Sequence, residues 1–349
     1  MNRTRCLLHA GASLLLVISI DTALSGANPA DDPAQVLQSD RPDYREYLVR
    51  SLDRYRTRFF PRLDTGIKGG DNLHPAAMLA AAEVRAWQWT KDERYAHAAA
   101  ERLRLIAQRI DALHQVNFFT PYPLAFAYRG LAEGQKVNEP FRQAMERFVT
   151  KCVVPRDDTN LNNQTMIRAC GLELAAQVWP HVKPAHAWHE YALKIYRLLE
   201  RTEDIPENSP NYNTFDLLCT FLLTDLLDKH ELLARPGIRA MYVRYRDQIS
   251  PRGWIAPYGD AGNPSRPPNP DWPITSPWAQ YVPPFERAAR EYRDPTLRWA
   301  ALHLAQAGSR YQPLGTSAHD AEELFYMSFA AEWMDPTLAP QRPRSTSQI

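Results

Sequence analysis

Segments with the spacing of amphipathic helices follow one another along almost the whole chain, and this recurrence constrains the fold more than any other feature. Apolar residues return every three to four positions over stretches of about 10 to 20 residues, separated by short breaks. Alternating runs of Val, Ile, Thr and aromatic residues, typical of strands, are scarce. The sequence therefore predicts an all-α protein. About twelve helices are expected, over residues 44–59, 75–89, 93–110, 124–132, 139–149, 163–178, 185–199, 214–230, 236–248, 277–290, 295–307 and 320–333.

The arrangement of these helices is constrained by length and by the absence of a clear repeat. The chain has 349 residues, which a single large helical domain can contain. Self-similarity at a fixed period is weak, which argues against an open solenoid. Antiparallel helices can instead close as paired inner and outer layers, so we expect a single-domain (α/α) toroid or incomplete barrel. Residues 250–276, rich in Pro, Gly, Asn and Trp, interrupt the helical pattern, and a loop of this length is usually functional.

The two ends of the chain have different compositions from the helical part. Residues 1–27 resemble a secretory signal, with Arg3 and Arg5 before an apolar stretch and small residues near Ala27. We expect a flexible lead-in over residues 28–40, the helical domain over residues 41–337 and a polar tail over residues 338–349. No later stretch has the roughly 20 apolar residues of a membrane span. A periplasmic or secreted protein, free of the membrane after signal cleavage, is expected.

Charge and cysteine content argue against two classes of function. The formal net charge is +1, so nothing indicates nucleic-acid binding, although basic groups gathered in one cleft could still attract an anionic polymer. Cys152, Cys170 and Cys219 remain after signal cleavage, without CxxC or Cys/His ligand spacing, so a metal site is not expected. Cys170 and Cys219 lie within apolar helix patterns and are interpreted as core residues.

In three segments, polar residues lie where a purely structural helix would not place them. Residues 160–165 read Asn-Leu-Asn-Asn-Gln-Thr and lead into an apolar helix, and residues 206–215 open another. Residues 255–262 contain Tyr-Gly-Asp within the long loop. Each segment also has a structural interpretation: Asn162 or Asn163 as a helix cap, Tyr212 as a packing residue, and the third segment as a turn.

Taken together, these segments resemble the alginate lyase and heparinase II/III-like polysaccharide lyases, over roughly residues 70–335. In that family a helix starts with Asn-Asn-His, and a later element of the type Pro-Glu-Gly-Ser-Pro-Gly-Tyr-His carries the catalytic tyrosine. The similar elements here are Asn162-Asn163-Gln164 and Pro-Glu-Asn-Ser-Pro-Asn-Tyr-Asn over residues 206–213. The resemblance implies an α/α-toroid enzyme that cleaves an acidic, uronate-containing polysaccharide such as alginate or glucuronan by β-elimination.

The resemblance also implies roles for individual residues. Abstraction of a uronate C5 proton requires that the adjacent carboxylate be neutralised, and the amides of Asn163 and Gln164 can hydrogen-bond it. Arg168, one turn beyond Gln164, could supply a cation, although it could equally be a surface charge. Tyr212 would be the base, the acid for the leaving oxygen, or both. The pKa of a free tyrosine is about 10. Tyr212 could therefore act as the base only if cationic or hydrogen-bonding neighbours lowered its pKa. This chemistry requires no cofactor.

Two departures from the family pattern bear on the mechanism. Gln164 and Asn213 stand where the family commonly has histidines, and a glutamine cannot take a proton. This favours proton transfer by Tyr212 alone, in a syn-elimination. It is also compatible with an inactive, glycan-binding relative, or with a histidine supplied from elsewhere. His74, at the start of a predicted helix, is the first candidate, with capping or packing as its other interpretation.

Further substrate contacts are expected from the polar segments and the long loop. Asn162, Glu207, Tyr258, Asp260 and Trp254 are the candidates, because amides and carboxylates bond sugar hydroxyls and aromatic faces stack on sugar rings. Exposed members of residues 118–123, Phe-Phe-Thr-Pro-Tyr-Pro, could add stacking positions.

Two other functions remain open from the sequence alone. An α/α-barrel glycoside hydrolase would need two carboxylates flanking the scissile bond, for which Glu207, Asp216 and Asp260 are candidates. A non-catalytic glycan-binding protein of the same fold would bind the polymer without turnover. The reaction products distinguish a glycoside hydrolase from a lyase, because only a lyase leaves an unsaturated sugar.

Overall fold

A computed structural model describes residues 32–56, 73–206, 209–251, 253, 255, 278–311 and 319–343. Within these ranges there are twelve α-helices and no strand, and one isolated antiparallel bridge joins Ile249 to Ile255. Each expected helix is present, so the predicted all-α class is confirmed. The helices are α1 (Tyr44–Arg56), α3 (Leu73–Thr90), α4 (Glu93–Ala107), α5 (Pro121–Glu133), α6 (Glu139–Cys152), α7 (Asn163–Val178), α8 (Ala185–Thr202), α9 (Pro210–Leu227), α10 (Pro236–Arg246), α11 (Val282–Tyr292), α12 (Pro295–Tyr311) and α13 (His319–Trp333).

The helix boundaries follow local chemical signals. Asp92 and Asn138 cap α4 and α6, with side-chain oxygens that accept hydrogen bonds from Arg94 N and Phe141 N. Proline occupies the first turn of α5, α6, α9, α10 and α11, where its missing N–H has no intrahelical partner to lose. At the other end, the residue that follows α8, α9 or α11 has a left-handed backbone conformation, which stops the helix.

Three helix starts differ from the expected positions by three or more residues, and proline explains each of these differences. α5 begins at Pro121 instead of residue 124, and α9 begins at Pro210 instead of residue 214. α11 begins at Val282 instead of residue 277, because two prolines follow directly and are tolerated only in the first turn. Prolines in a first turn extend a helix towards its N-terminus, whereas apolar periodicity alone detects only the interior.

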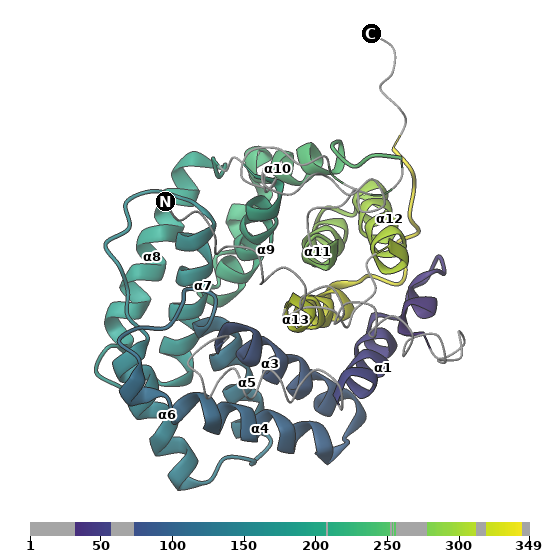
Figure 1. Cartoon of the computed structure of the whole chain (residues 1–349). Coiled ribbons are helices and arrows are strands. Elements are labelled where there is room, and N and C mark those ends of the chain that lie inside the picture. The colour runs from purple at the N-terminus through teal and green to yellow at the C-terminus, as the bar shows by residue number, and fades with distance from the viewer. Residues whose placement is uncertain are drawn as a thin grey trace, which may run out of the picture.

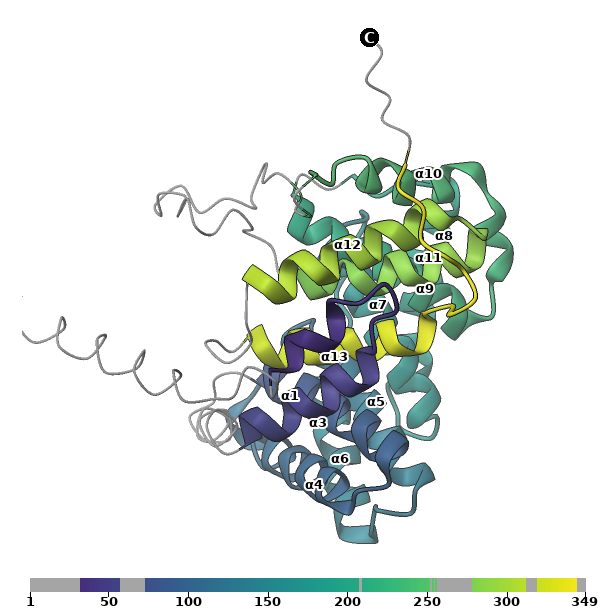
Figure 2. The ribbon, with the colours of Figure 1, turned by 90° about the vertical axis from the view of Figure 1, so that its right-hand side faces the viewer.

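The order of helix contacts returns to its starting point. α3 packs against α5, α5 against α7, α7 against α9, α9 against α11 and α11 against α13, and α13 packs against α3. We call these six the inner helices. Figure 1 shows them around the centre of the molecule, with α4, α6, α8, α10, α12 and α1 outside them. The side view in Figure 2 shows α11, α12 and α13 lying next to one another, in agreement with their contacts.

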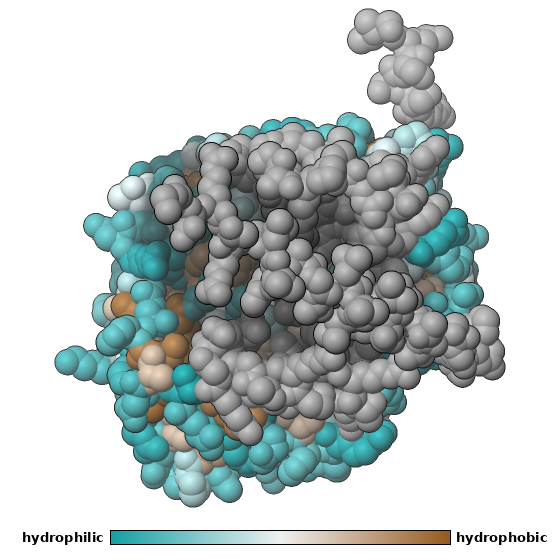
Figure 3. All heavy atoms as spheres, viewed as in Figure 1, coloured by the Kyte–Doolittle hydropathy of each residue, from teal (hydrophilic) through white to brown (hydrophobic). Residues whose placement is uncertain are grey.

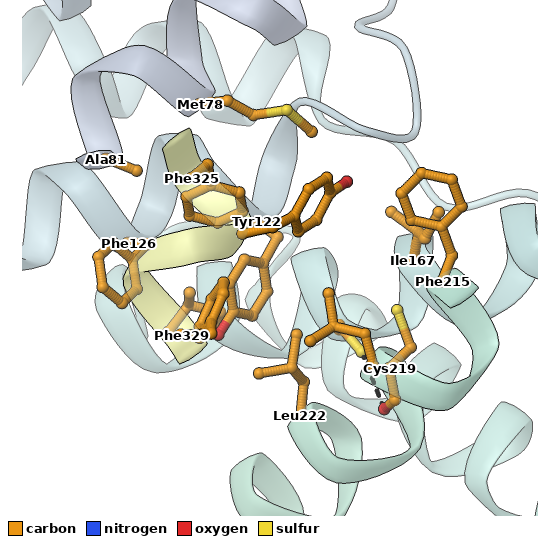
Figure 4. Packing of buried hydrophobic residues seen from close by; sticks show 14 of the residues in the cluster. Met78, Ala81, Tyr122, Phe126, Ile167, Phe215, Cys219, Leu222, Phe325 and Phe329 are labelled. Carbon is orange, nitrogen blue, oxygen red and sulfur yellow. Dashed lines mark hydrogen bonds between the residues drawn. The ribbon is translucent and has the colours of Figure 1, made fainter. Parts of the chain in front are cut away.

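The space between the inner helices is filled by apolar and aromatic side chains. Phe325 and Phe329 pack edge-on with ring centroids 5.0 Å apart, and both lie within about the same distance, 6.1 Å, of Phe126. A small cavity of about 30 Å³ lies in this core, lined by Tyr122, Phe215 and Phe325 among others. The core therefore separates the two ends of the helix assembly. Figure 4 shows Met78, Ala81, Tyr122, Phe126, Ile167, Phe215, Cys219, Leu222, Phe325 and Phe329, contributed by five of the inner helices.

Buried charged groups connect inner helices to outer ones. Glu83 of α3 pairs with Arg102 of α4 at 2.9 Å, and both are almost fully buried. Glu286 of α11 accepts hydrogen bonds from Tyr44 of α1, at 2.6 Å, and from Arg298 of α12. Loss of one partner would leave a buried charge without compensation, so these pairs depend strongly on correct helix packing.

The described parts of the predicted lead-in and tail contact the helices. Residues 33–37 form a 3₁₀ helix in which Leu37 is fully buried, and the Gln38 side chain donates to Gln306 O at 3.1 Å. Near the other end, Gln341 N donates to Pro295 O at 2.9 Å.

Few large hydrophobic side chains are exposed among the described residues. Residues at the rim in Figure 3 are mainly hydrophilic, and Val154 is the one exposed large hydrophobic residue in the described ranges. Among the helices that the structure describes, none has both the length and the apolar character needed to cross a membrane.

Candidate functional site

The first turns of several inner helices meet at one aromatic residue, Phe119, which precedes α5. Its ring lies 5.8 Å from the ring of His74 at the start of α3, and 5.0 Å from Phe215 in the second turn of α9. Phe215 in turn lies 5.8 Å from Tyr326 of α13. Glu322, in the first turn of α13, lies 3.4 Å from His74 Nε2, so the N-terminal ends of α3, α9 and α13 are at the same end of the assembly.

The start of α7 joins the same region through Phe118. Phe118 and Phe119 are in ring contact at 4.5 Å, and the guanidinium of Arg168, in the second turn of α7, lies 5.8 Å from the Phe118 ring. The structure thus brings His74, the start of α7 and the start of α9 to one end of the helix assembly. We call this region the N-terminal end.

His74 is held from two sides. Its Nε2 lies 3.4 Å from Oε1 of Glu322, in the first turn of α13, and its ring packs against Phe119. The Glu322 side chain is 11% exposed and the His74 side chain is 29% exposed. One part of the imidazole is therefore accessible to a ligand while the carboxylate is largely covered.

The three residues Asn162, Asn163 and Gln164 have different environments. Asn162 is the N-cap of α7: its Oδ1 accepts from Thr165 N at 3.0 Å, and the Thr165 hydroxyl accepts from Asn162 N at 3.0 Å. The capping interpretation of Asn162 is therefore confirmed, and its side-chain oxygen Oδ1 is occupied by the hydrogen bond from Thr165 N. Asn163 is buried, and Gln164 is exposed. Gln164 is the one of the three whose amide faces solvent most fully.

Arg168 is buried and paired with a carboxylate, so it is not the surface charge that was one of its two interpretations. It is only 3% exposed and forms an ion pair with Asp158, while its Nη1 lies 3.3 Å from the Tyr191 hydroxyl. The same hydroxyl donates to Asp158. Burial, together with the bond to Asp158, raises the pKa of Tyr191 above its usual value. Because Asp158 already compensates its charge, Arg168 is a weaker candidate for neutralising a substrate carboxylate.

Tyr212 is the third residue of α9 and is partly exposed. Its backbone N–H donates to Ser209 O at 3.2 Å, and the Asn213 side chain donates to the same oxygen at 2.9 Å. One residue further, the Thr214 hydroxyl donates to Gln280 Oε1 at 3.2 Å. These contacts fix the backbone that carries the tyrosine, while its side chain retains access to solvent.

A cavity of about 560 Å³ lies beside this region, between the start of α7 and the end of α8. Its lining contains no charged side chain, so it combines hydroxyl and amide groups with apolar surface, as small-molecule pockets commonly do. The lining residues are Thr159, Asn160, Leu161, Asn162, Leu198, Thr202 and Pro206.

Four predicted contact residues, Glu207, Trp254, Tyr258 and Asp260, lie outside the described residues. Asp216, a candidate carboxylate of the hydrolase alternative, is 2% exposed and lies on α9 beyond Phe215.

In the described ranges, no three His, Cys, Asp or Glu side chains are grouped so that they could hold a metal ion. Cys152, Cys170 and Cys219 are buried free thiols, as the core interpretation of the last two predicted.

Sequence reasoning did not identify Glu322, Asp158 or Tyr191. Glu322 is one of two adjacent acidic residues in the first turn of α13, where acidic residues commonly stabilise a helix, so its pattern carries no sign of a site. Asp158 lies in a polar segment before α7, and nothing in one sequence links it to Arg168.

No protein-family model matches the chain, and a search of curated proteins gives no match either.

Proposed function

We propose that this chain is a polysaccharide lyase that cleaves an acidic, uronate-containing polysaccharide by β-elimination at the N-terminal end. The observation that carries the proposal is the convergence at Phe118 and Phe119: segments distant in sequence, bearing His74, Gln164 and Tyr212, lie at one end of the helix assembly. The partial exposure of Tyr212 and the exposure of Gln164 make both available to a polymer.

The proposed fold is an (α/α) toroid of inner and outer helices. It is supported by the succession of inner-helix contacts that returns from α13 to α3, and by the outer position of the alternate helices. In such an arrangement the inner helices run in the same direction, so their N-termini share one end. The backbone N–H groups at those ends carry partial positive charge, which favours an anionic ligand.

The proposed chemistry proceeds without water as a reactant. The Gln164 amide, with Asn163 behind it, hydrogen-bonds the uronate carboxylate and stabilises the charge that develops when the C5 proton is removed. Tyr212, in the tyrosinate form, accepts the C5 proton, the C5–H electrons form the C4–C5 double bond, and the C4–O bond breaks. The leaving glycosidic oxygen then takes this proton from the Tyr212 hydroxyl on the same face, which restores the tyrosinate and makes the reaction a syn-elimination.

Two observations support a second candidate, a glycan-binding protein that has lost activity. Gln164 stands where the family commonly has a histidine, and Asp158 compensates the buried cation Arg168. The neutral cavity beside α7 would then bind sugar without a reaction. The hydrolase alternative has no such support in the described residues, where Asp216 is buried.

The test is product analysis on a panel of uronate polysaccharides, including alginate, glucuronan and glycosaminoglycans. A lyase gives oligosaccharides with a conjugated double bond, detected by ultraviolet absorbance, whose masses are lower by one water than those of hydrolysis products. Products of the hydrolytic mass would instead support a glycoside hydrolase. Binding without any product on the panel would contradict the lyase proposal and support the binding protein.

A further inference from the structure

A second cavity, of about 380 Å³, lies between the outer helices α4 and α6. Its lining comes from these two helices, from the residues next to their ends and from Ile110 in the short 3₁₀ helix Ile110–Ala112. Figure 1 shows α4 and α6 outside the inner helices, and no residue with a role in the proposed mechanism lines this cavity. We call it the outer cavity.

The lining of the outer cavity is basic. It contains two arginines, Arg104 from α4 and Arg147 from α6, and no Asp or Glu. The amides of Gln108 and Asn138 add hydrogen-bonding groups, and the other lining residues are apolar. Guanidinium groups bind carboxylates in a planar, two-pronged geometry. The combination of positive charge, amides and apolar surface therefore suits a sugar unit that carries a carboxylate better than a neutral sugar.

Arg104 is held in place before any ligand binds. Its Nη1 donates to Glu101 Oε1 at 2.9 Å, and its guanidinium lies 4.8 Å from the centre of the Phe141 ring. Phe141 is only 3% exposed, and its backbone N–H donates to the Asn138 side chain at 3.1 Å. The guanidinium is thus positioned against a fixed ring, while 35% of its side-chain surface remains accessible.

Arg147 supplies the charge that is not compensated. Arg142, also on α6, pairs with both Glu139 and Glu146. Arg147 is exposed and forms no ion pair with any residue that the structure describes. The acidic residues of α6 are therefore already engaged, and the Arg147 guanidinium is available to an anion.

We infer that the outer cavity binds a uronate unit of the acidic polymer, as a second binding site that takes no part in the elimination. The identity of the polymer rests on the proposed function. Arg147, with Arg104 beside it, bonds the carboxylate, and the apolar side chains of Ile110 and Pro140 contact the sugar ring. A polymer bound there stays on the protein between successive cleavages, because rebinding at the N-terminal end is then intramolecular.

The binding test uses Tyr212→Phe protein, in which ligand is not consumed. Tetrasaccharides from glucuronan and from alginate are the probes, and cellotetraose matches the glucuronan probe without its carboxylates. Both acidic probes should shift the Nε–Hε nuclear magnetic resonance signals of Arg104 and Arg147, whereas cellotetraose should not. Adding Arg147→Gln should weaken binding at the outer cavity by about 3- to 10-fold. The matched control is Arg197→Gln, which removes an exposed arginine of α8 outside this cavity and should change nothing.

Kinetics separate this site from the one that carries out the reaction. With Tyr212 present, Arg147→Gln should leave kcat on short oligosaccharides unchanged. Absence of the arginine shifts, or equal shifts with cellotetraose or with inorganic phosphate alone, would overturn the inference, and unsaturated product from the wild type would then leave the lyase proposal intact. Binding of the acidic probes in the outer cavity, without product from the wild type on any polymer, would overturn the lyase proposal alone.

Discussion

The Arg168–Asp158 pair gives a prediction whose magnitude follows from burial. Arg168 is 3% exposed and Asp158 is 22% exposed, so Asp158→Asn leaves a buried guanidinium without its carboxylate. Breaking a fully buried pair costs about 3–5 kcal/mol. Because Asp158 retains some solvent contact, we expect about 2–3 kcal/mol here, a change of roughly 30- to 150-fold in the unfolding equilibrium.

The neighbouring residue provides the control. Asp157 pairs with Lys194 at 3.1 Å, but its side chain is 96% exposed, so Asp157→Asn should change stability by less than about 0.5 kcal/mol. Urea denaturation followed by far-ultraviolet circular dichroism measures both variants, and the shift in midpoint multiplied by the m-value gives the free-energy change. Equal stability of Asp157→Asn and Asp158→Asn would refute the view that Arg168 is a buried, compensated cation, and would return it to the candidates for substrate binding.

Three further predictions concern the fold. Gly171→Ala should destabilise the protein by about 1–3 kcal/mol in the same assay, because its methyl group would lie 2.8 Å from Pro121 Cβ on α5. Glu286→Met should cost about 3–5 kcal/mol by leaving Arg298 uncompensated, and adding Arg298→Met should recover most of this loss. Burial lowers the pKa of His303, so the unfolded chain binds more protons just below its unfolded pKa of about 6.5, and stability is lost as pH falls through this range. His303→Gln should flatten that slope in thermal unfolding measured against pH, by less than about 1 kcal/mol because the ring is partly exposed.

The helices could be predicted because their signals are local. Apolar periodicity located each helix interior, and the prolines in the first turns of α5, α9 and α11 explain why those helices begin elsewhere than the periodicity indicated. Asn162 was identified as a possible cap from residue type alone, and its capping box confirms this.

The candidate site could be predicted only in part, because its contacts join distant segments. The sequence identified His74 and Arg168 by their positions at helix starts, but their carboxylate partners, Glu322 and Asp158, depend on how the helices pack. A spacing rule along one helix gives neighbours at three or four positions, and neither partner is such a neighbour. The compensation of Arg168 by Asp158 therefore became evident only in three dimensions.

The most direct test of the central claim compares wild-type protein with Tyr212→Phe on the same polymer. Both are monitored for unsaturated product by ultraviolet absorbance and for polymer affinity by calorimetry. We expect product formation by the wild type, a decrease in rate of at least about 10²-fold in Tyr212→Phe, and similar affinity for both, since only the proton-transferring hydroxyl is removed. Wild-type rates in Tyr212→Phe would exclude this tyrosine from the mechanism, and absence of product from the wild type on every uronate polymer would show that the protein is not a lyase of this class.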